Sequence, residues 1–283
     1  MKKFIIAVLA KVYDKNPISY GILRKLYRGE VAGIACIMII PFIPIWNYMA
    51  VKEIEKIRSN GNIFCLAKRN IKFYLPELDI HCGEFIQNRI FLERDYFEIF
   101  HLKQLKGNIK KSAVILDIGA NIGNHTIFFA KECGASKIYA FEPTQKTFQT
   151  LVKNIEINRL DRKVVTMNVA LGSKDSKVKV IVNEEDAGSN YVVENVNGDT
   201  TMHTLDGMTF NEHIDFVKID VEGYEFEVLK GAVKTIKRYN PDIFVEIFDE
   251  NYERVNSLLL QMDYECVLKI EQDYLYRSIT KKG

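Results

Sequence analysis

Residues 113–130 constrain the fold more than any other stretch, because they combine a buried strand, a glycine-containing turn and the start of a helix. The apolar run Val114-Ile115-Leu116 ends on Asp117 and is followed by the turn Gly119-Ala120-Asn121-Ile122-Gly123. An unbroken apolar run is typical of a strand in a parallel sheet that is buried on both faces. Glycine and asparagine tolerate positive φ, and the helix directs its free N–H groups and partial positive charge at the turn. The stretch therefore predicts a site that binds a nucleotide.

Strand and helix patterns alternate from residue 113 to the end of the chain, which indicates an α/β domain with a mostly parallel sheet. We expect strands at 114–117, 137–141, 164–169, 216–220 and 242–247, a β excursion at 178–182, and two last strands near 264–270 and 274–279. We expect helices over 144–158, 225–237 and 250–261, and a polar loop over 186–199. Upstream, an extended stretch around 72–76 precedes an amphipathic helix over 89–105, which ends at Gly107-Asn108.

The first 51 residues differ in character from the rest of the chain. Residues 1–30 are basic, and residues 31–51 carry no charge. The uncharged segment is long enough for a membrane span, which needs about 20 residues. Pro41, Pro44 and Asn47 are expected to interrupt a helix near the middle of this segment. Two interpretations stay open: a membrane-surface or re-entrant anchor, and a buried helical hairpin that covers a dimer face or the main domain.

Composition limits the partners and the compartment. The net charge of +2 is too close to neutral to indicate nucleic acid, and the five cysteines are scattered without a CxxC pair or a Cys/His cluster. We therefore predict a cytoplasmic protein without disulfides, metal site or nucleic-acid partner. If the N-terminal segment is a membrane anchor, the protein would lie at the inner face of the membrane. Three parts are expected: residues 1–60 as a basic and apolar extension, 61–112 as an accessory lead-in, and 113–283 as the cofactor-binding domain.

Glu142 and Asp117 narrow the choice of nucleotide. Glu142 follows the second predicted strand, where a carboxylate can accept hydrogen bonds from both ribose hydroxyls of a nucleotide and would repel a 2′-phosphate. The alternative is a glutamate that is simply solvated at the end of the strand. The turn reads G-x-N-x-G and lacks the three glycines of the dinucleotide fingerprint. Asp117, just before the turn, suits an amine or a sulfonium better than phosphates. These features favour S-adenosylmethionine over NAD.

Six blocks, in this order along the chain, resemble the FkbM family of S-adenosylmethionine-dependent methyltransferases: VILDIGANIGNHT, AFEP, NVALGS, TLDG, FVKIDVEGYEFEVLKGA and PDIFVEI. The resemblance covers residues 70–270, has KIDVEG as its most specific part and leaves out the first 60 residues. It implies a Rossmann-like, seven-stranded, mostly parallel sheet with an antiparallel last strand. It also implies O-methylation of hydroxyls on sugars, polyketides or similar acceptors. If the acceptor is a glycan, the protein would act in polysaccharide biosynthesis.

The same resemblance assigns residues to the cofactor. It places the methionine part on Asp117, Gly119, Ala120, Asn121 and Gly123, the ribose on Glu142 and Pro143, and the adenine along 168–171, which includes Asn168 and Ala170. His125 and Thr126 open the helix after the turn, and His125 is either a partly exposed residue or a contact of the cofactor carboxylate. Gly188-Ser189-Asn190 is expected in a lid over the acceptor.

Methyl transfer to a sugar hydroxyl gains about 10²–10⁴-fold from a general base. Asp220 is the first candidate because it ends a strand at the ligand edge of the sheet; Glu222, Glu246 and His203 follow. Asp220 could instead orient the substrate, Glu222 could fix its own loop, and Glu246 could form an ion pair with Lys218. The three acidic residues could also gather a hard cation, a site that the sequence itself does not show. A nucleotide-binding oxidoreductase and a non-catalytic membrane assembly protein stay as alternative functions.

Overall fold

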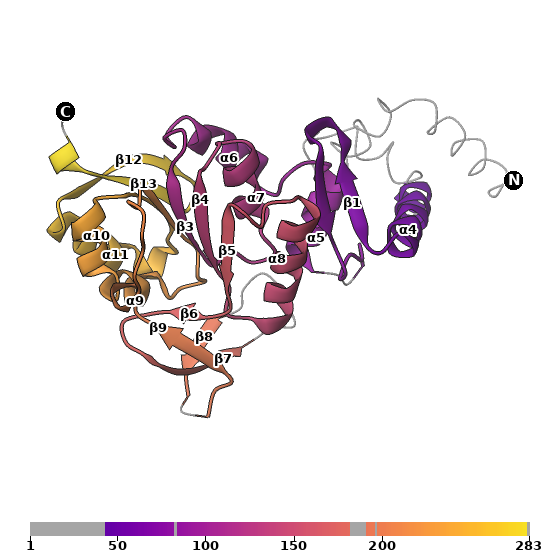
Figure 1. Ribbon diagram of the computed structural model, residues 1–283. Helices are drawn as coiled ribbons and strands as arrows, with labels where there is room; N and C mark the ends of the chain where they lie inside the picture. Colours follow the sequence, from indigo (N-terminus) through magenta and orange to yellow (C-terminus); the bar gives the residue numbers. More distant parts are fainter. Residues whose placement is uncertain (1–42, 82–83, 182–190, 196, 282–283) are drawn as a thin grey trace, which may run out of the picture. The chain divides into compact units, whose positions relative to one another are not determined.

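The computed structural model of the chain describes residues 43–81, 84–181, 191–195 and 197–281 (Figure 1). The chain folds into two compact units. The N-terminal unit comprises the described residues up to Asn70 together with Leu75–Phe97, and the core unit comprises Ile71–Tyr74 and Glu98–Gly283. No helix in the described ranges combines the length and the apolar character that a membrane crossing requires.

The N-terminal unit consists of α4 (Ile43–Ser59), β1 (Ile63–Leu66), the 3-10 turn η2 (Ala67–Arg69) and α5 (Phe85–Glu93). Helix α4 runs through Asn47, so the predicted interruption at this residue is wrong, whereas Pro44 is the second residue of the helix and the chain before Ile43 lies outside the described residues. Pro44 lies in the first turn, where a helix needs no N–H donor. The remainder of the uncharged segment, residues 31–42 with Pro41, lies outside the described residues. Glu53 of α4 forms an ion pair with Arg94, which ties α4 to the end of α5.

The helix predicted over 89–105 is two helices. Helix α5 ends at Glu93, and α6 (Ile99–Lys106) begins in the core unit. The break lies at Arg94 and Glu98, whose φ angles of 54° and 55° are left-handed. Arginine and glutamate are not the residue types that mark this conformation in a sequence, which is why periodicity alone missed the break. Gly107 follows the end of α6, as predicted.

The core unit is built around a seven-stranded sheet in the order β12-β13-β11-β10-β3-β4-β5 (Figure 1). The strands are β3 (Val114–Ile118), β4 (Lys137–Phe141), β5 (Val164–Met167), β10 (Phe216–Ile219), β11 (Asp242–Glu246), β12 (Tyr264–Ile270) and β13 (Asp273–Ser278). Strands β11, β10, β3, β4 and β5 run parallel, and β13 is antiparallel to both of its neighbours. The predicted α/β class and the mostly parallel sheet with an antiparallel last strand are confirmed. The preceding short strand β2 (Ile71–Tyr74) confirms the extended stretch expected there.

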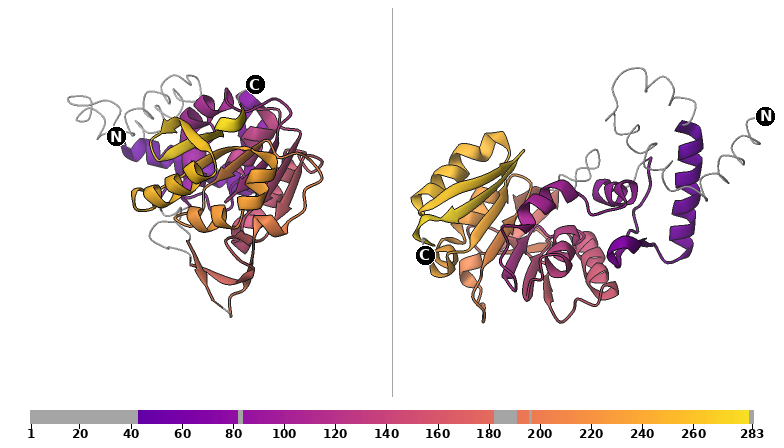
Figure 2. Two further views of the ribbon diagram at one scale, coloured as in Figure 1. Left: turned by 90° about the vertical axis from the view of Figure 1, so that its left-hand side faces the viewer. Right: turned by 90° about the horizontal axis from the view of Figure 1, so that it is seen from above.

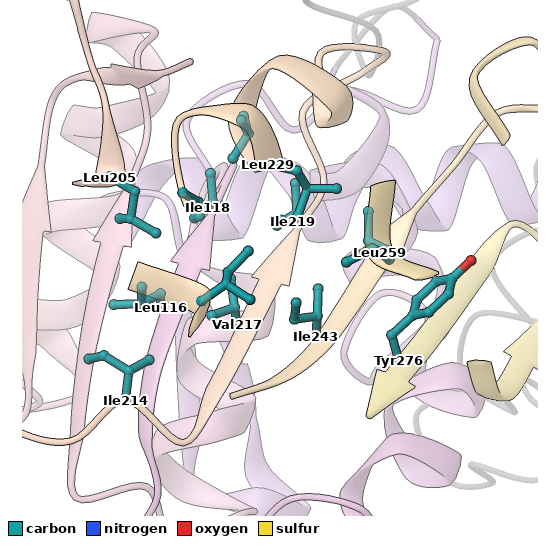
Figure 3. Close-up of a cluster of buried hydrophobic side chains, with 14 of the residues drawn as sticks. Leu116, Ile118, Leu205, Ile214, Val217, Ile219, Leu229, Ile243, Leu259 and Tyr276 are labelled. Atoms are coloured by element: carbon teal, nitrogen blue, oxygen red, sulfur yellow. The ribbon is translucent and has the colours of Figure 1, made fainter. Parts of the chain in front are cut away.

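Helices cover both faces of this sheet (Figure 2). They are α7 (Asn124–Lys131), α8 (Gln145–Ile157), α9 (Glu225–Lys230), α10 (Val233–Tyr239) and α11 (Asp249–Gln261). On one face, Leu116 and Val217 belong to a buried cluster with Leu259 of α11 (Figure 3). On the other face, Phe129 of α7 packs edge-on against Phe216 of β10, with ring centroids 6.0 Å apart. Burial of each such side chain contributes about 1.5–3 kcal/mol, so the sheet is a rigid support for the loops at its edge.

A second sheet, in the order β6-β9-β7-β8, follows strand β5. Its strands are β6 (Ala170–Leu171), β7 (Ser176–Ile181), β8 (Tyr191–Glu194) and β9 (Thr200–His203). The predicted β excursion is therefore part of a four-stranded sheet, and the prediction of a loop throughout 186–199 is wrong at β8, which pairs with β7. The lid expected at Gly188-Ser189-Asn190 lies outside the described residues.

The helix predicted over 225–237 is also divided, into α9 and α10. The division lies at Gly231, where an added Cβ would be 1.9 Å from the carbonyl oxygen of Gly172. Backbone from the start of the second sheet thus approaches the chain between the two helices too closely for any side chain. This contact is made by residues far apart in the sequence, so helical periodicity could not indicate it.

Candidate active site

The turn between β3 and α7 has the left-handed backbone that its composition predicted. Gly119, Asn121 and Gly123 have φ angles of 75°, 49° and 90°. The N–H groups of Gly119 and Ala120 donate to the carbonyl oxygen of Phe141, at 3.0 and 2.9 Å, which joins the turn to the end of β4. A Cβ added at Gly119 would lie 1.7 Å from the carbonyl oxygen of Asp220, at the end of β10, so only glycine fits there.

Glu142 lies directly against this turn. Its carboxylate accepts hydrogen bonds from the backbone N–H of Asn121 at 3.0 Å and of Thr144 at 2.8 Å. Burial raises the pKa of Glu142 to about 7. Each carboxylate oxygen has a second lone pair, so the group can still accept from a ligand hydroxyl. The amide of Asn168 donates to the carbonyl oxygens of Glu142 and Pro143, at 2.8 and 3.0 Å, and so holds the backbone of this segment in place.

Asp117 and Lys218 lie opposite each other on β3 and β10, and their side chains are almost fully buried. The Nζ of Lys218 donates to the carbonyl oxygen of Gly119 at 2.8 Å and lies 3.0 Å from Asp220 Oδ2 and 3.6 Å from Asp117 Oδ1. Thr126 of α7 donates to the other oxygen of Asp117. Burial alone would lower the pKa of Lys218, but the two carboxylates raise it above its ordinary value. The charged ammonium therefore connects the turn to the acidic groups at the end of β10.

The three predicted catalytic carboxylates come together. Oxygens of Asp220, Glu222 and Glu246 all lie within 4.8 Å of one another. Burial and the charge of Asp220 raise the pKa of Glu246 to about 10, so Glu246 is protonated at neutral pH and donates a hydrogen bond to Asp220. Burial would raise the pKa of Asp220, but the Lys218 charge and this hydrogen bond lower it below its usual value. In the part of the chain that the structure describes, Lys218 forms its ion pairs with Asp117 and Asp220, which does not match the alternative pairing with Glu246.

Two candidates lie in the second sheet. His203 is on β9, and its Nδ1 lies 3.4 Å from an oxygen of Asp175. The structure does not bring His203 into the carboxylate group, since its ion pair is made within the second sheet. Ala170 is on β6, where its side chain is buried against Val178 and Met202.

Sequence reasoning missed three titratable residues near these carboxylates: Glu98, His101 and Asp273. The Nδ1 of His101 lies 2.9 Å from Asp273 Oδ2, and its Nε2 lies 3.7 Å from Glu271 Oε2. Asp273 is the partner of Glu246 across β11 and β13. Burial raises the pKa of Glu98 to about 7, with a further contribution from the charge of Asp273. The only signal in the sequence was the i, i+3 spacing of Glu98 and His101, which places them on one side of a helix start.

His125 belongs to the same region. It lies in the first turn of α7 with 9% of its surface exposed, so of the two alternatives for His125 the partly exposed helix-start residue does not fit. Its Nε2 lies 3.8 Å from Glu98 Oε2. Burial lowers the pKa of His125 to about 3, so the imidazole is neutral at neutral pH.

The part of the chain that carries these groups matches a known protein family. The family model described as Methyltransferase FkbM domain matches residues 117–277, which is more than half of the chain. The chain belongs to this family. The predicted family and its methyltransferase class are therefore confirmed, and the matched region contains all the residues predicted to form the site.

Individual relatives are more distant. The chain is 28% identical over 165 residues to the hexuronic acid methyltransferase AglP of Haloferax volcanii, covering 53% of the chain and 66% of the relative. It is 24% identical over 174 residues to Methyltransferase 1 of Beauveria bassiana, covering 52% of the chain and 66% of the relative. The matches thus span slightly less than two thirds of these relatives. Among solved structures, the methyltransferase FkbM of Methylobacillus flagellatus is similar at 16% identity, covering 82% of this chain and 60% of that one, with a TM-score of 0.47.

Proposed function

We propose that the protein is an S-adenosylmethionine-dependent O-methyltransferase that acts on a hydroxyl group of a sugar or glycan. The observation that carries this proposal is the arrangement at one edge of the sheet. The left-handed glycine turn, the carboxylate of Glu142 and the ionised carboxylate of Asp220 all follow strands that are neighbours in the sheet. Carboxyl ends of parallel strands are where α/β folds bind their ligands, so these groups would face one bound molecule.

The residues of the turn fit the proposed cofactor, which would supply a methyl group activated by a sulfonium. Glu142 would accept the ribose hydroxyls with the lone pairs that Asn121 and Thr144 leave open. Gly119 and Asn121 give the methionine part access to the backbone. Asp117 is fully buried and bonded to Thr126 and Lys218, so we assign it to holding the turn rather than to direct contact.

Asp220 would accept the proton of the acceptor hydroxyl as the oxygen attacks the methyl carbon. Its carboxylate is ionised, 30% exposed and fixed by Lys218 and Glu246, so it can reach a substrate from a defined position. Protonated Glu246 would stabilise the charge of Asp220 before the transfer. Glu222, with a left-handed φ of 51°, lies where the loop after β10 could orient the acceptor.

The acceptor class is supported by the relative whose name specifies hexuronic acid as its substrate. A sugar offers several hydroxyls of similar reactivity, so selectivity would come from positioning. We extend the proposal to polysaccharide biosynthesis and to contact between residues 1–51 and a membrane surface; of this segment, residues 1–42 lie outside the described residues.

Calorimetric titration of the full chain with S-adenosylhomocysteine and, separately, with NAD tests the cofactor. Binding of S-adenosylhomocysteine is expected, and binding of NAD alone would support the oxidoreductase alternative and overturn the proposal. Incubation with methyl-labelled S-adenosylmethionine and a panel of uronic acids and neutral sugars tests the acceptor. Mass spectrometry of glycans from a strain that lacks the protein should show the loss of one methyl group per site. Unchanged glycans together with cofactor-free protein would favour a non-catalytic role.

Affinity for S-adenosylhomocysteine is expected to rise with pH up to about 7 and then level off. Glu142, with its pKa of about 7, must lose its proton before both ribose hydroxyls can donate to it. Below this pKa the affinity should therefore increase by up to about tenfold per pH unit. Glu142→Gln should remove this slope and weaken binding by about 1.5–3 kcal/mol at high pH.

The matched control for this titration is Glu225→Gln. Glu225 is also buried and its pKa is also raised to about 7 by burial, but its carboxylate accepts from the N–H of Gly223 in its own loop. The pH slope should therefore persist in this variant. A slope that survives Glu142→Gln and disappears in Glu225→Gln would remove the ribose assignment from Glu142.

Asp220→Asn is expected to lower turnover by about 10²-fold while affinity for S-adenosylhomocysteine stays nearly constant, because an amide cannot accept the proton. Turnover is measured by the formation of S-adenosylhomocysteine with an acceptor from the sugar panel. Asp175→Asn, in the connection between β6 and β7, is the control and should have wild-type turnover. Equal losses of affinity and turnover in Asp220→Asn would make this residue structural.

A further inference from the structure

Four side chains at the edge of the sheet have no role in the proposed transfer: Glu98, His101, His125 and Asp273. They come from three segments, namely the start of α6, the first turn of α7 and the start of β13. One ligand atom from each of Glu98, His101 and Asp273 lies within 4.8 Å of the other two. His125 adjoins this group through Glu98. One imidazole and two carboxylates therefore surround one small volume, and the imidazole of His125 lies beside it, next to Glu98.

The separations suit a shared metal ion. Two ligands that bind one ion at about 2.1 Å are about 3.0 Å apart at a right angle and about 4.2 Å apart on opposite sides. The Nδ1 of His101 and the Oδ2 of Asp273 are 2.9 Å apart, and the Nε2 of His125 and the Oε2 of Glu98 are 3.8 Å apart. Both values fall within or next to this range without any change of the backbone.

The imidazole of His125 is available to a ligand beside this group. The His125 side chain is 11% exposed, and its ring makes no hydrogen bond to any residue that the structure describes. Its Nε2 points to the carboxylate of Glu98, but 3.8 Å is too long for a hydrogen bond. The ring nitrogens of His125 are not among the buried side-chain atoms that lack a partner, so they are accessible to a ligand bound beside Glu98.

The charge of the group points to a cation. Within the described ranges, no lysine or arginine lies within 4.0 Å of the carboxylates of Glu98 or Asp273, and the basic side chains within that distance are the imidazoles of His125 and His101. The nearby ammonium of Lys218 already contacts Asp220, Asp117 and the backbone of Gly119. Two carboxylates that share a partly buried region without a lysine or arginine leave room for a positive ligand.

We propose that Glu98, His101, His125 and Asp273 bind one divalent first-row transition-metal ion. Imidazole nitrogen together with carboxylate oxygen suits Mn²⁺, Fe²⁺, Co²⁺ or Zn²⁺ better than Mg²⁺ or Ca²⁺, which prefer oxygen ligands alone. The role of the ion rests on the proposed function: it would bind the acceptor hydroxyl and lower its pKa, so that Asp220 removes the proton more readily. The binding of the ion itself does not depend on that function.

This inference departs from the sequence-based prediction of no metal site, and it differs from the cation site weighed there. The group of Asp220, Glu222 and Glu246 contains only carboxylates, and the ammonium of Lys218 lies 3.0 Å from Asp220. A second cation there would meet direct repulsion from the first. The two groups can be told apart because only one of them contains histidine.

Mn²⁺ is the probe for the test, added to the full chain after treatment with a chelator. Electron paramagnetic resonance should show that one equivalent of Mn²⁺ is bound and that it couples to imidazole nitrogen. His101→Asn, His125→Asn and Asp273→Asn should each raise the Kd for Mn²⁺ by at least about tenfold. His213→Asn is the matched control, because His213 also lies near an aspartate, Asp215, at 3.6 Å, but is 63% exposed.

Absence of Mn²⁺ binding, or binding without nitrogen coupling, would overturn the proposal. The nitrogen coupling is measured on the wild-type chain, so misfolding of a variant does not affect this result. Loss of binding in Asp220→Asn with retention in both histidine variants would place the ion in the other group and would also overturn it. Titration with S-adenosylhomocysteine is run in parallel. Mn²⁺ binding without cofactor binding would leave the metal site intact and reject the proposed function, and the reverse result would reject only the metal site.

Discussion

Replacing Lys218 by methionine is expected to lower the free energy of unfolding by about 3–5 kcal/mol, because it leaves the carboxylates of Asp117 and Asp220 without their counter-charge. Methionine has a similar volume, so the loss is not one of packing. Lys218 is 2% exposed, and its ammonium has three partners, the carbonyl oxygen of Gly119 at 2.8 Å and the two carboxylates at 3.0 and 3.6 Å. Urea unfolding followed by circular dichroism measures the effect.

Two further variants separate charge from geometry in this result. Lys110→Met removes an ion pair with Asp215 of 3.2 Å, but Lys110 is 75% exposed, so the expected cost is below about 1 kcal/mol. Adding Asp220→Asn to Lys218→Met should recover part of the lost stability, since one uncompensated charge is removed. If the double variant is less stable than Lys218→Met alone, the network is held by shape and not by charge.

Local patterns were sufficient to predict the strand, turn and helix around Gly119. The apolar run, the two glycines and Asn121 each act through backbone preferences that do not depend on distant residues. Glu142 could be linked to this turn because neighbouring parallel strands end at the same edge of a sheet. The hydrogen bond from the N–H of Asn121 to Glu142 is the direct result of that rule.

Other elements depend on contacts that no local pattern reveals. The break between α5 and α6 lies at Arg94 and Glu98, which adopt left-handed backbone conformations without glycine or asparagine. Strand β8 was expected to be loop because its polar surroundings suggest one, yet pairing with β7 defines it as a strand. Such outcomes are decided by tertiary packing, which outweighs intrinsic preference in short segments.

The same limit explains what was missed at the site. His101 and Asp273 are 172 positions apart and come together because α6 begins, and β13 starts, at the edge of the sheet where the parallel strands end. A single histidine and a single aspartate carry no spacing signal at that separation. Asp220, Glu222 and Glu246 were found because they follow strands directly, where sheet geometry alone indicates convergence.

Gly119→Ala is expected to destabilise the core unit by about 3–5 kcal/mol and to abolish binding of S-adenosylhomocysteine. Alanine at φ 75° costs about 1–2 kcal/mol by itself. The larger part arises because the new Cβ would lie 1.7 Å from the carbonyl oxygen of Asp220, which is backbone and cannot rotate away. The loop that carries Asp220 must then move, and the carboxylate would lose its position relative to Lys218.

Gly134→Ala isolates the contribution of that close approach. Gly134 has a similar φ of 70°, but no atom lies within 4 Å of an added Cβ, so only the backbone strain of about 1–2 kcal/mol is expected. Urea unfolding and calorimetric titration of both variants give the difference. A Gly119→Ala protein with the stability of Gly134→Ala and intact cofactor binding would mean that the loop after β10 yields freely. Asp220 would then lack the fixed position that its proposed role as a base requires.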